Sequence, residues 1–462
     1  MKRAYLTFMW TLTKAFDIHP KSLVAIVGGG GKTSLLFGLA QNLANPQASE
    51  VSETSEVLRV VTTTTTRIFA AQMKLATAVC FADDLNELGA HLDAHGSCLV
   101  VGETQGDKAL GVEATMPGKL LARPDVDVVL VEADGSRMRP IKAPADHEPV
   151  LPAETTHLVP VVGIDALAGP IEAVAHRPER VAALTGLAVR DVLTETAVST
   201  LLTHPDGGAK NKPPSAKLIP LINKVETDRQ LAQARRIALN ALRQPAVDRV
   251  VIAALRQQQP VVEVRERVTA VILAAGLGSR MGEATKQLLP WGDTTVLGQT
   301  LRHVGQSDVT DVLVVSGHEA ANIEAVALAA GAATVYNADY ATGEMVSSLQ
   351  TAVRHLPPAC AAVLVLLADQ PMVPPAIINQ ILTAFAQGKS DLIAPVYQGK
   401  RGNPVLIARR YFAELLALPA DAAPRALLQR HANRLHLEEV ATDAILRDLD
   451  RPEDYERERP SQ

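Results

Sequence analysis

The chain has 462 residues, 47% of them hydrophobic and only 3% aromatic, and its formal net charge is −5. This length allows two or three domains with aliphatic cores, and the mild negative charge argues against nucleic acid or an anionic membrane as a partner. Three cysteines without a C-x-x-C pair are typical of a reducing compartment, so we expect a cytoplasmic protein. No apolar run reaches the length of a membrane-spanning helix. The apolar patch after Lys2 and Arg3 is interpreted as a helix, with a signal peptide as the alternative.

Aliphatic runs typical of buried strands alternate with helical patterns along the whole chain. In the first half, strands are expected at 23–27, 58–64, 98–101, 126–131, 157–162, 217–222 and 249–254. In the second half, they are expected at 269–274, 311–316, 333–337, 362–368, 391–396 and 404–408, with helices at 323–330, 346–355 and 376–386. Continuous aliphatic strands separated by helices predict an α/β protein with parallel sheets covered on both faces. A polar seam, Gln257 to Pro260, predicts a boundary between domains at 1–260 and 266–462.

The first motif that carries chemistry is a glycine loop between a strand and a helix, Gly28-Gly29-Gly30-Gly31-Lys32-Thr33-Ser34. Glycines let backbone N–H groups surround a phosphate, Lys32 can reach that phosphate, and the Thr33 hydroxyl can bind Mg²⁺. The loop is of a short G-x-x-G-K-T kind, because Ile26 stands where the common P-loop has glycine. We expect residues 28–34 to bind ATP or GTP; the alternative is a plain turn with an exposed lysine.

The strand at 126–131 runs into two carboxylates, Glu132 and Asp134. One of them is expected to face a metal ion at Thr33, and the pattern does not decide which. The hydroxyls of residues 62–66 follow a strand, and strand propensity explains them better than a binding role.

Three further motifs in the first half are ambiguous. His147 and Glu148 could bind metal or substrate, but a loop packed by prolines is the alternative, and His176-Arg177-Pro178 is equally ambiguous. The segment 223–226 reads Asn-Lys-Val-Glu, and we do not predict guanine binding from it because Glu226 is one methylene too long.

Residues 1–260 resemble the selenium-dependent hydroxylase accessory proteins of the YqeC type. The resemblance rests on the glycine loop, the threonine run, and segments 131–137 and 142–149. It implies a P-loop NTPase-like accessory domain with a three-layer fold, acting in the maturation of a molybdenum hydroxylase. The apo-enzyme of that hydroxylase is therefore an expected partner.

A second glycine loop follows the strand at 269–274 and is the most informative stretch of the chain. It comprises Leu273, Ala274, Ala275, Gly276, Gly278, Arg280, Met281 and Gly282, with Lys286 four residues on. A dinucleotide-binding loop would have glycine at Met281 and a ribose-binding acid about 20 residues later. Two cations beside a glycine loop suit a nucleoside triphosphate better, so we expect Arg280 and Lys286 to hold its phosphates.

Carboxylates near the end of the chain are candidates for a metal site. The strand at 362–368 leads directly into Asp369, which is suited to Mg²⁺ at the carboxyl end of a parallel strand. Its alternative role is a helix N-cap. Asp448 and Asp450 lie in a late acidic segment that can supply further metal ligands if it folds back, and the alternative there is a solvated turn.

Residues 268–462 resemble the nucleotidyltransferases of molybdenum cofactor, above all the cytidylyltransferases. The motifs that carry the resemblance occur in family order: the 273–286 loop, Asn337 with Gly343, Ser347 and Ser348, Asp369-Gln370-Pro371, Gly402-Asn403-Pro404, and residues 448–455. The resemblance implies a Rossmann-like nucleotidyltransferase domain with a mostly parallel sheet. It further implies that CTP, bound with Mg²⁺ at Asp369, is attacked by the terminal phosphate of the molybdopterin cofactor and releases pyrophosphate.

Several points stay open at this stage. Asn337, Ser347 and Ser348 touch base or ribose, or else serve as a helix cap. The family's late Gly-Asp-x-Gly-x-Arg turn reads Ala-Asp-Ala-Ala-Pro-Arg at 420–425, which puts its contact with the pterin in doubt. The acceptor could instead be a sugar or polyol phosphate, or the chain could be an NTP-dependent cofactor delivery protein.

Overall fold

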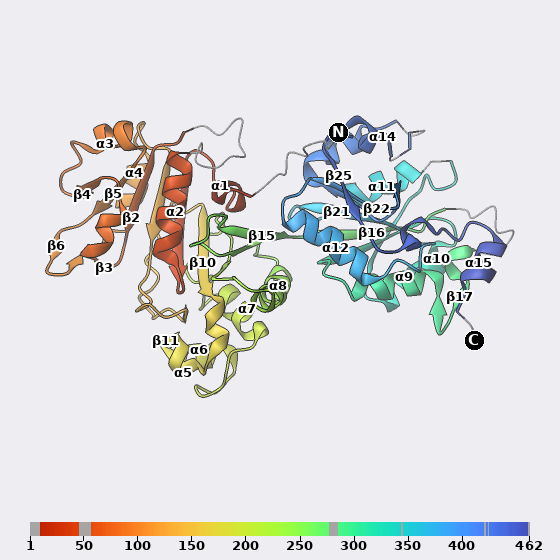
Figure 1. The fold of residues 1–462 in the computed structure, drawn as a ribbon, viewed down its shortest axis with the longest axis horizontal. Helices are drawn as coiled ribbons and strands as arrows, with labels where there is room; N and C mark the ends of the chain where they lie inside the picture. The colour runs from red at the N-terminus through yellow and green to blue at the C-terminus, as the bar shows by residue number, and fades with distance from the viewer. Residues whose placement is uncertain are drawn as a thin grey trace. The chain divides into compact units, whose positions relative to one another are not determined.

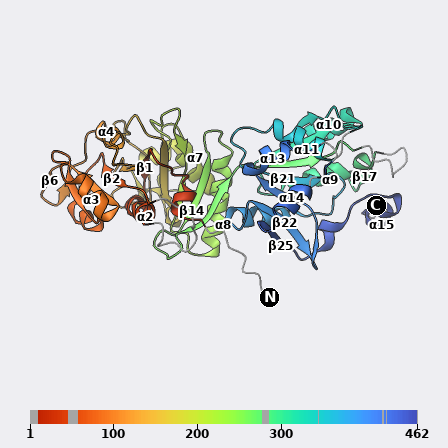
Figure 2. The same cartoon turned by 90° about the horizontal axis from the view of Figure 1, so that it is seen from above.

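The computed structural model describes residues 10–45, 57–276, 285–342, 345–419, 422–423 and 425–460. The chain divides into two compact units, Met9–Arg265 and Glu266–Gln462, each built around its own large sheet (Figures 1 and 2). Among the helices of the described residues, none combines the length and the apolar character needed to cross a bilayer. The expected helix over the first ten residues lies outside the described part, except for its last residue.

The first unit contains a ten-stranded sheet in the order β15-β14-β13-β10-β1-β8-β2-β5-β4, with β12 beside β10. Its strands are β1 (Ser22–Gly28), β2 (Val60–Thr64), β4 (Val79–Phe81), β5 (Ser97–Val101), β8 (Val128–Glu132), β10 (His157–Gly163), β12 (Lys217–Leu218), β13 (Leu221–Asn223), β14 (Arg249–Ala253) and β15 (Val261–Glu266). The pairs from β4 to β14 are parallel. The loops after β1, β8, β10 and β13 therefore meet at one edge of the sheet.

Two layers of helices cover this sheet because its strands are apolar on both faces. In β1, Val24 and Ile26 pack toward α1 (Leu12–Ala15) and α2 (Lys32–Ala44), while Leu23 and Ala25 belong to the opposite core. Helices α3 (Leu88–His95), α4 (Met116–Leu121), α6 (Pro178–Thr185), α7 (Glu195–Thr203) and α8 (Asp228–Leu242) contribute to that opposite core. Figure 1 shows α2 running along the sheet directly after β1.

The second unit contains an eight-stranded sheet in the order β20-β19-β16-β21-β24-β22-β23, with β25 beside β22. Strands β16 (Val268–Leu273), β19 (Asp311–Ser316), β20 (Ala333–Tyr336) and β21 (Ala362–Leu367) are parallel. Strand β24 (Val405–Ala408) is antiparallel to both β21 and β22 (Leu392–Tyr397), and β23 (Lys400–Arg401) and β25 (Leu435–Glu439) complete the sheet.

Helices cover both faces of this second sheet as well. Helices α9 (Val296–Gly305), α10 (Ala320–Ala329) and α12 (Pro375–Ala386) pack on one face. Helices α11 (Met345–Arg354), α13 (Phe412–Leu416) and α14 (Arg425–Arg430) pack on the other. The expected α/β class with largely parallel sheets is thus confirmed for both halves of the chain.

Two of the differences between the structure and the expected elements have a clear physical reason. The strand expected at 217–222 is split into β12 and β13, because Pro220 between them has no N–H to donate to a neighbouring strand. Residues 261–265, which the expected bounds left between the two domains, instead belong to β15, the edge strand of the first sheet. Its Glu263 is fully buried and is paired with Arg235 and Arg265, so the first unit extends about five residues beyond the expected boundary at 260.

Candidate functional site

The first glycine loop connects β1 to α2 in a backbone shape that only glycine adopts readily. Gly30 has a φ of +81° and Gly31 a φ of +141°. A Cβ on Gly30 would lie 2.2 Å from the backbone nitrogen of Gly163, and one on Gly31 would lie 2.1 Å from Nδ2 of Asn223. The run of glycines is therefore required by close packing against the loops after β10 and β13.

Lys32 begins α2 and is almost completely buried among acidic side chains. Its Nζ donates to the carbonyl oxygen of Gly28 at 2.8 Å and lies 3.6 Å from Oε1 of Glu132 and 3.4 Å from Oδ1 of Asp134. Asp134 also accepts hydrogen bonds of 3.0 and 3.1 Å from the backbone nitrogen of Gly28. The structure thus brings together the lysine and both carboxylates that the sequence predicted for one site.

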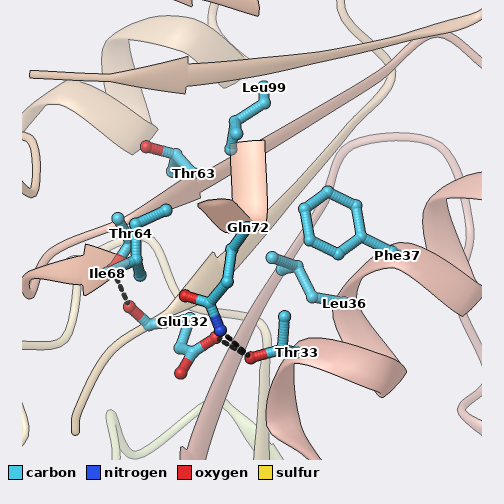
Figure 3. A pocket seen from close by; sticks show the side chains of 9 residues that line it. All are labelled: Thr33, Leu36, Phe37, Thr63, Thr64, Ile68, Gln72, Leu99 and Glu132. Atoms are coloured by element: carbon cyan, nitrogen blue, oxygen red, sulfur yellow. Dashed lines mark hydrogen bonds between the residues drawn. The ribbon is translucent and has the colours of Figure 1, made fainter. Parts of the chain in front are cut away.

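The geometry distinguishes the two carboxylates, which the sequence could not do. The Thr33 hydroxyl donates to Oε2 of Glu132 at 3.0 Å and accepts from Nε2 of Gln72 at 3.2 Å (Figure 3). Burial raises the pKa of Glu132, and Lys32 and Thr33 counter part of that effect. Glu132 is therefore the carboxylate beside the predicted metal-binding hydroxyl, while Asp134 supports the loop backbone.

A small pocket lies between α2 and the 3-10 helix η2 (Ala70–Leu75), next to Thr33. Figure 3 shows its lining residues: Thr33, Leu36, Phe37, Thr63, Thr64, Ile68, Gln72, Leu99 and Glu132. The Thr63 hydroxyl donates to the carbonyl of Val100, and the Thr64 hydroxyl to that of Glu132. Because β2 lies inside the sheet and these hydroxyls bond to its neighbouring strands, the contacts favour the structural explanation of the threonine run.

Asn223, whose motif the sequence left without a role, holds the glycine loop in place. Its Nδ2 donates to the carbonyl of Gly30 at 2.8 Å, and its Oδ1 accepts from the backbone nitrogen of Leu255 at 3.1 Å. No side chain caps the amino-terminal end of α2. The backbone N–H groups of Lys32, Thr33 and Ser34 are therefore placed at a helix N-terminus, where an anion is favoured.

A chain of ion pairs continues from Asp134 away from the loop. Lys142 lies 3.0 Å from Oδ2 of Asp134 and 2.7 Å from Oε2 of Glu148, and Arg177 makes contacts of 2.7 and 3.2 Å with the same glutamate. His147, the neighbour of Glu148, is exposed. Sequence reasoning noted these residues separately but did not link them, because 29 residues separate Glu148 from Arg177.

The Glu148 cluster predicts how stability depends on pH. Burial alone raises the pKa of Glu148, but hydrogen bonds from Arg177 and Lys142 outweigh it and hold the pKa at about 2. A carboxylate with a depressed pKa stabilises the fold above its unfolded-state pKa, and this stabilisation is lost as pH falls toward 2. We expect Glu148→Gln to remove on the order of 3 kcal/mol of that pH dependence.

The measurement is urea unfolding between pH 5 and pH 2.5 for wild type and Glu148→Gln. Wild type is expected to lose stability more steeply over this range, while the variant is less stable at pH 5 and flatter below it. Glu172→Gln, at an exposed carboxylate of the same unit, serves as the control and is expected to follow wild type. Parallel curves for wild type and Glu148→Gln would contradict the assigned pKa.

In the second unit, Lys286 and Asp369 meet at the carboxyl end of β21. Lys286 begins the 3-10 helix η5 (Lys286–Leu288), and its Nζ contacts Oδ2 of Asp369 and lies 3.1 Å from Oδ1 of Asp450. Asp369 lies two residues after the end of the buried strand β21, and it is itself buried. Burial alone lowers the pKa of Lys286, but the charges and hydrogen bonds of Asp369 and Asp450 outweigh this effect and raise the pKa. The protonated, positively charged form of Lys286 is therefore favoured.

The late acidic segment folds back to the end of β21. This is the condition under which the segment was expected to supply further metal ligands. The backbone nitrogen of Leu449 donates to the carbonyl of Asp369 at 3.2 Å, and Oδ1 of Asp448 accepts from Nε2 of Gln370 at 2.5 Å. Burial, followed by the nearby charge of Asp369, raises the pKa of Asp448. Within the described residues, no group of three or more His, Cys, Asp or Glu side chains is placed to hold a metal ion. Lys286 stands between two of the predicted ligands, so the metal set stays a prediction.

The second glycine loop is described only at its start. Ala274 and Ala275 follow β16 and are buried, as is Leu273; the backbone nitrogen of Ala274 donates to the carbonyl of Val315 at 3.0 Å. A Cβ on Gly276 would meet no atom of the described residues within 4 Å. The predicted phosphate-binding residues Gly278 and Arg280 lie outside the described residues, and so do Ala420 and Asp421 of the altered turn.

The three residues predicted to touch base or ribose hydrogen-bond to one another. Nδ2 of Asn337 donates to the hydroxyls of Ser347 and Ser348, each at 3.0 Å. All three side chains are buried, where β20 ends and α11 begins. In these contacts Asn337 donates to serine hydroxyls and does not accept from backbone N–H groups of the helix, so both the helix cap and a contact with the nucleotide stay predictions.

Comparisons with known proteins agree with the division into two halves. Residues 24–179 match the family described as YqeC protein. The chain is 32% identical over 204 residues to Uncharacterized protein YqeC of Escherichia coli (strain K12), an alignment that covers 44% of this chain and 76% of that protein. The chain belongs to the YqeC family. Residues 270–435 match the family described as MobA-like NTP transferase domain.

The second half also has a curated relative and solved relatives. It is 28% identical over 190 residues to molybdenum cofactor cytidylyltransferase of Escherichia coli (strain K12), covering 41% of this chain and 93% of that protein. Two solved structures are also similar. Rv0371c from Mycobacterium tuberculosis H37Rv is 29% identical, and the match covers 41% of this chain and 97% of that chain with a TM-score of 0.37. A nucleotidyl transferase from Methanothermobacter thermautotroptrophicus is 25% identical, and the match covers 42% of this chain and 96% of that chain with a TM-score of 0.37. Both family resemblances expected from the motifs are confirmed by the sequence matches.

Proposed function

We propose that the MobA-like domain transfers CMP from CTP to the terminal phosphate of the molybdopterin cofactor. The observation that carries this proposal is the meeting of Lys286, Asp369 and Asp450 at the end of β21, on the strand that pairs with the one preceding the glycine loop. The similarity to a molybdenum cofactor cytidylyltransferase supports the choice of acceptor and nucleotide.

The chemistry asks for charge neutralisation and alignment more than for a protein nucleophile. A phosphate oxygen of the acceptor forms the new bond to the α-phosphorus of CTP, the bond from that phosphorus to the bridging oxygen breaks, and pyrophosphate leaves with the electron pair. Lys286 stabilises negative charge on the phosphates, with Arg280 as a second proposed cation.

The residues at this site fit a divalent metal ion. Asp369 and Asp450 already converge on one cation, the Lys286 ammonium, and carboxylate oxygens are the ligands that Mg²⁺ prefers. Asp369, with Asp448 or Asp450, would hold the Mg²⁺, which supplies further neutralisation of the triphosphate when it is bound. Binding would require Lys286 to turn from the carboxylates toward the phosphates.

For the YqeC domain we propose a P-loop site for ATP or GTP with Mg²⁺. The uncapped start of α2, the buried Lys32 and the Thr33–Glu132 pair support it. Its role would be in the maturation of a molybdenum hydroxylase, whose apo-enzyme is the proposed partner. Linking the two domains in one chain would raise the local concentration of one domain's product at the other.

One assay separates this function from the alternatives. The purified chain is mixed with Mg²⁺, molybdenum-loaded pterin cofactor and each of CTP, GTP or ATP in turn, and pyrophosphate is measured. We expect release with CTP that depends on the cofactor. Release that requires a sugar or polyol phosphate instead would indicate the first alternative. No release with any acceptor, together with NTP hydrolysis, would indicate a delivery protein.

A further inference from the structure

The segment after β8 contains a strained turn made by residues other than glycine. In the turn Ser136–Arg139, the backbone nitrogen of Arg139 donates to the carbonyl of Ser136 at 3.0 Å. The two central residues, Arg137 and Met138, have φ angles of +48° and +61°. These are the φ signs of a type I′ turn, which strongly favours Asn and Gly at both positions. Such strain, held by residues with side chains, is a feature of functional sites.

This turn is packed directly against the first glycine loop. The backbone nitrogen of Gly30 donates to the carbonyl of Arg139 at 3.1 Å, and a Cβ on Gly29 would lie 2.4 Å from the same oxygen. The turn therefore follows the acidic end of β8 and borders the loop whose phosphate-binding role we propose. Arg137 and Met138 are both exposed at this border.

Positive charge gathers around the turn. Arg137 forms no hydrogen bond or ion pair with another residue of the described ranges. Lys142 of β9 (Ile141–Lys142) pairs in register with His176 of β11 (Ala175–His176). Nδ1 of His176 is buried without a hydrogen-bond partner among the described residues. Burial, followed by the charges of Arg177, Lys142 and Arg137, lowers the pKa of His176, so the neutral form of its ring is favoured.

Among the described residues, carboxylates pair with two of these three cations. Glu148 and Asp134 pair with Lys142, and Glu148 pairs with Arg177. Arg137 is exposed and has no carboxylate partner among the described residues. An anion is the ligand that this arrangement favours.

We propose that Arg137 binds an anionic phosphoryl or carboxylate group next to the glycine loop. The inference rests on the proposed nucleotide site of the YqeC domain. It adds that Arg137, at the border of this site, binds an anion. The anion has two possible sources: the terminal phosphate of the bound NTP, or the anionic group of a second substrate. The strain in the turn is retained because it directs the Arg137 side chain outward at the border of the loop.

The test uses Arg137→Gly in the full chain, because glycine suits the left-handed backbone and the exposed position tolerates it. Three calorimetric titrations measure binding affinity. The first uses Mg·ADP or Mg·GDP, the second uses a non-hydrolysable triphosphate analogue, and the third uses inorganic phosphate in the presence of saturating Mg·diphosphate. Binding at the YqeC domain is taken as the part abolished by Lys32→Met. We expect the melting temperature to stay at or above that of wild type and diphosphate binding to be unchanged.

The decisive result is at least about a tenfold loss of affinity in one of the other two titrations. A loss for the triphosphate analogue alone identifies the terminal phosphate as the anion, and a loss for inorganic phosphate alone identifies a second substrate. Arg137→Lys should recover part of the affinity, and Met138→Gly, which relieves the same turn without removing charge, should match wild type.

Unchanged affinity of Arg137→Gly in both titrations would overturn the inference while leaving the nucleotide site intact. If wild type shows no Lys32-dependent binding of either diphosphate, the proposed nucleotide site fails, and this inference fails with it. The two failures are therefore distinguishable by the diphosphate titration alone.

Discussion

Asp369→Asn is expected to reduce the rate of pyrophosphate release from CTP by at least about a thousandfold. The reason is that groups held in place to stabilise the charge developing on the phosphates lower the activation barrier by several kcal/mol. The substitution keeps the shape of the side chain but removes the charge that Lys286 contacts at the end of β21. It also removes the proposed principal ligand of Mg²⁺. The measurement is a coupled pyrophosphatase assay with molybdenum-loaded pterin cofactor as acceptor.

The control for this prediction is Asp293→Asn in the same unit. Asp293 is exposed and is paired with Arg302 at 3.0 Å, so its loss is expected to change activity less than twofold. Circular dichroism of Asp369→Asn should show an intact fold, since Asp450 still pairs with Lys286. Near-normal turnover in folded Asp369→Asn would remove the carboxylate from the mechanism and favour the delivery-protein alternative.

Lys32→Met is expected to weaken Mg·NTP binding at the YqeC domain by about a hundredfold or more and to leave CTP turnover unchanged. The charge that would meet the phosphates is lost, while the side chain keeps its length. The variant also leaves Glu132 buried without its cation, while Asp134 keeps its ion pair with Lys142, and the loss costs about 3 kcal/mol or more of folding free energy. Nucleotide titration well below the melting temperature measures the effect on binding separately from the effect on stability.

Thr33→Val provides a second variant that does not disturb the buried charges. The Thr33 hydroxyl donates to Glu132, so valine removes a hydrogen bond but no charge. We expect it to weaken binding of NTP with Mg²⁺ and to have little effect on binding without the metal ion. Undiminished Mg·NTP affinity in both Lys32→Met and Thr33→Val would place any nucleotide site of this domain away from the glycine loop.

Much of the fold could be predicted from the sequence, because the strands are aliphatic on both faces. The run at 362–368 corresponds to β21 and the run at 23–27 to β1, each within one or two residues. Both glycine loops were found for a similar reason. A glycine run between a strand and a helix, followed by a lysine, restricts the backbone and the local charge whatever the rest of the chain does.

The parts that the sequence did not predict depend on partners far apart in the chain. Residues 261–265 fell between the two expected domains, yet they belong to β15, where the buried Glu263 is compensated by Arg235 from α8, 28 residues away. Asn223 looked like part of an incomplete base-recognition motif, yet it bonds to Gly30 from 193 residues away. A linear pattern contains no information about which polar groups will satisfy one another at such separations.

The order of residues along the chain by itself determined the α/β class, the positions of the two glycine loops and the presence of carboxylates at strand ends, since these follow from local periodicity and composition. Only the tertiary structure decided that Glu132 and not Asp134 meets Thr33, that the acidic segment near residue 450 returns to Asp369, and that Arg137 lies exposed in a turn with positive φ. Those outcomes depend on which polar and charged groups hydrogen-bond to one another. These groups come from distant parts of the chain and meet only when the parallel strands place their carboxyl ends at the same edge of a sheet.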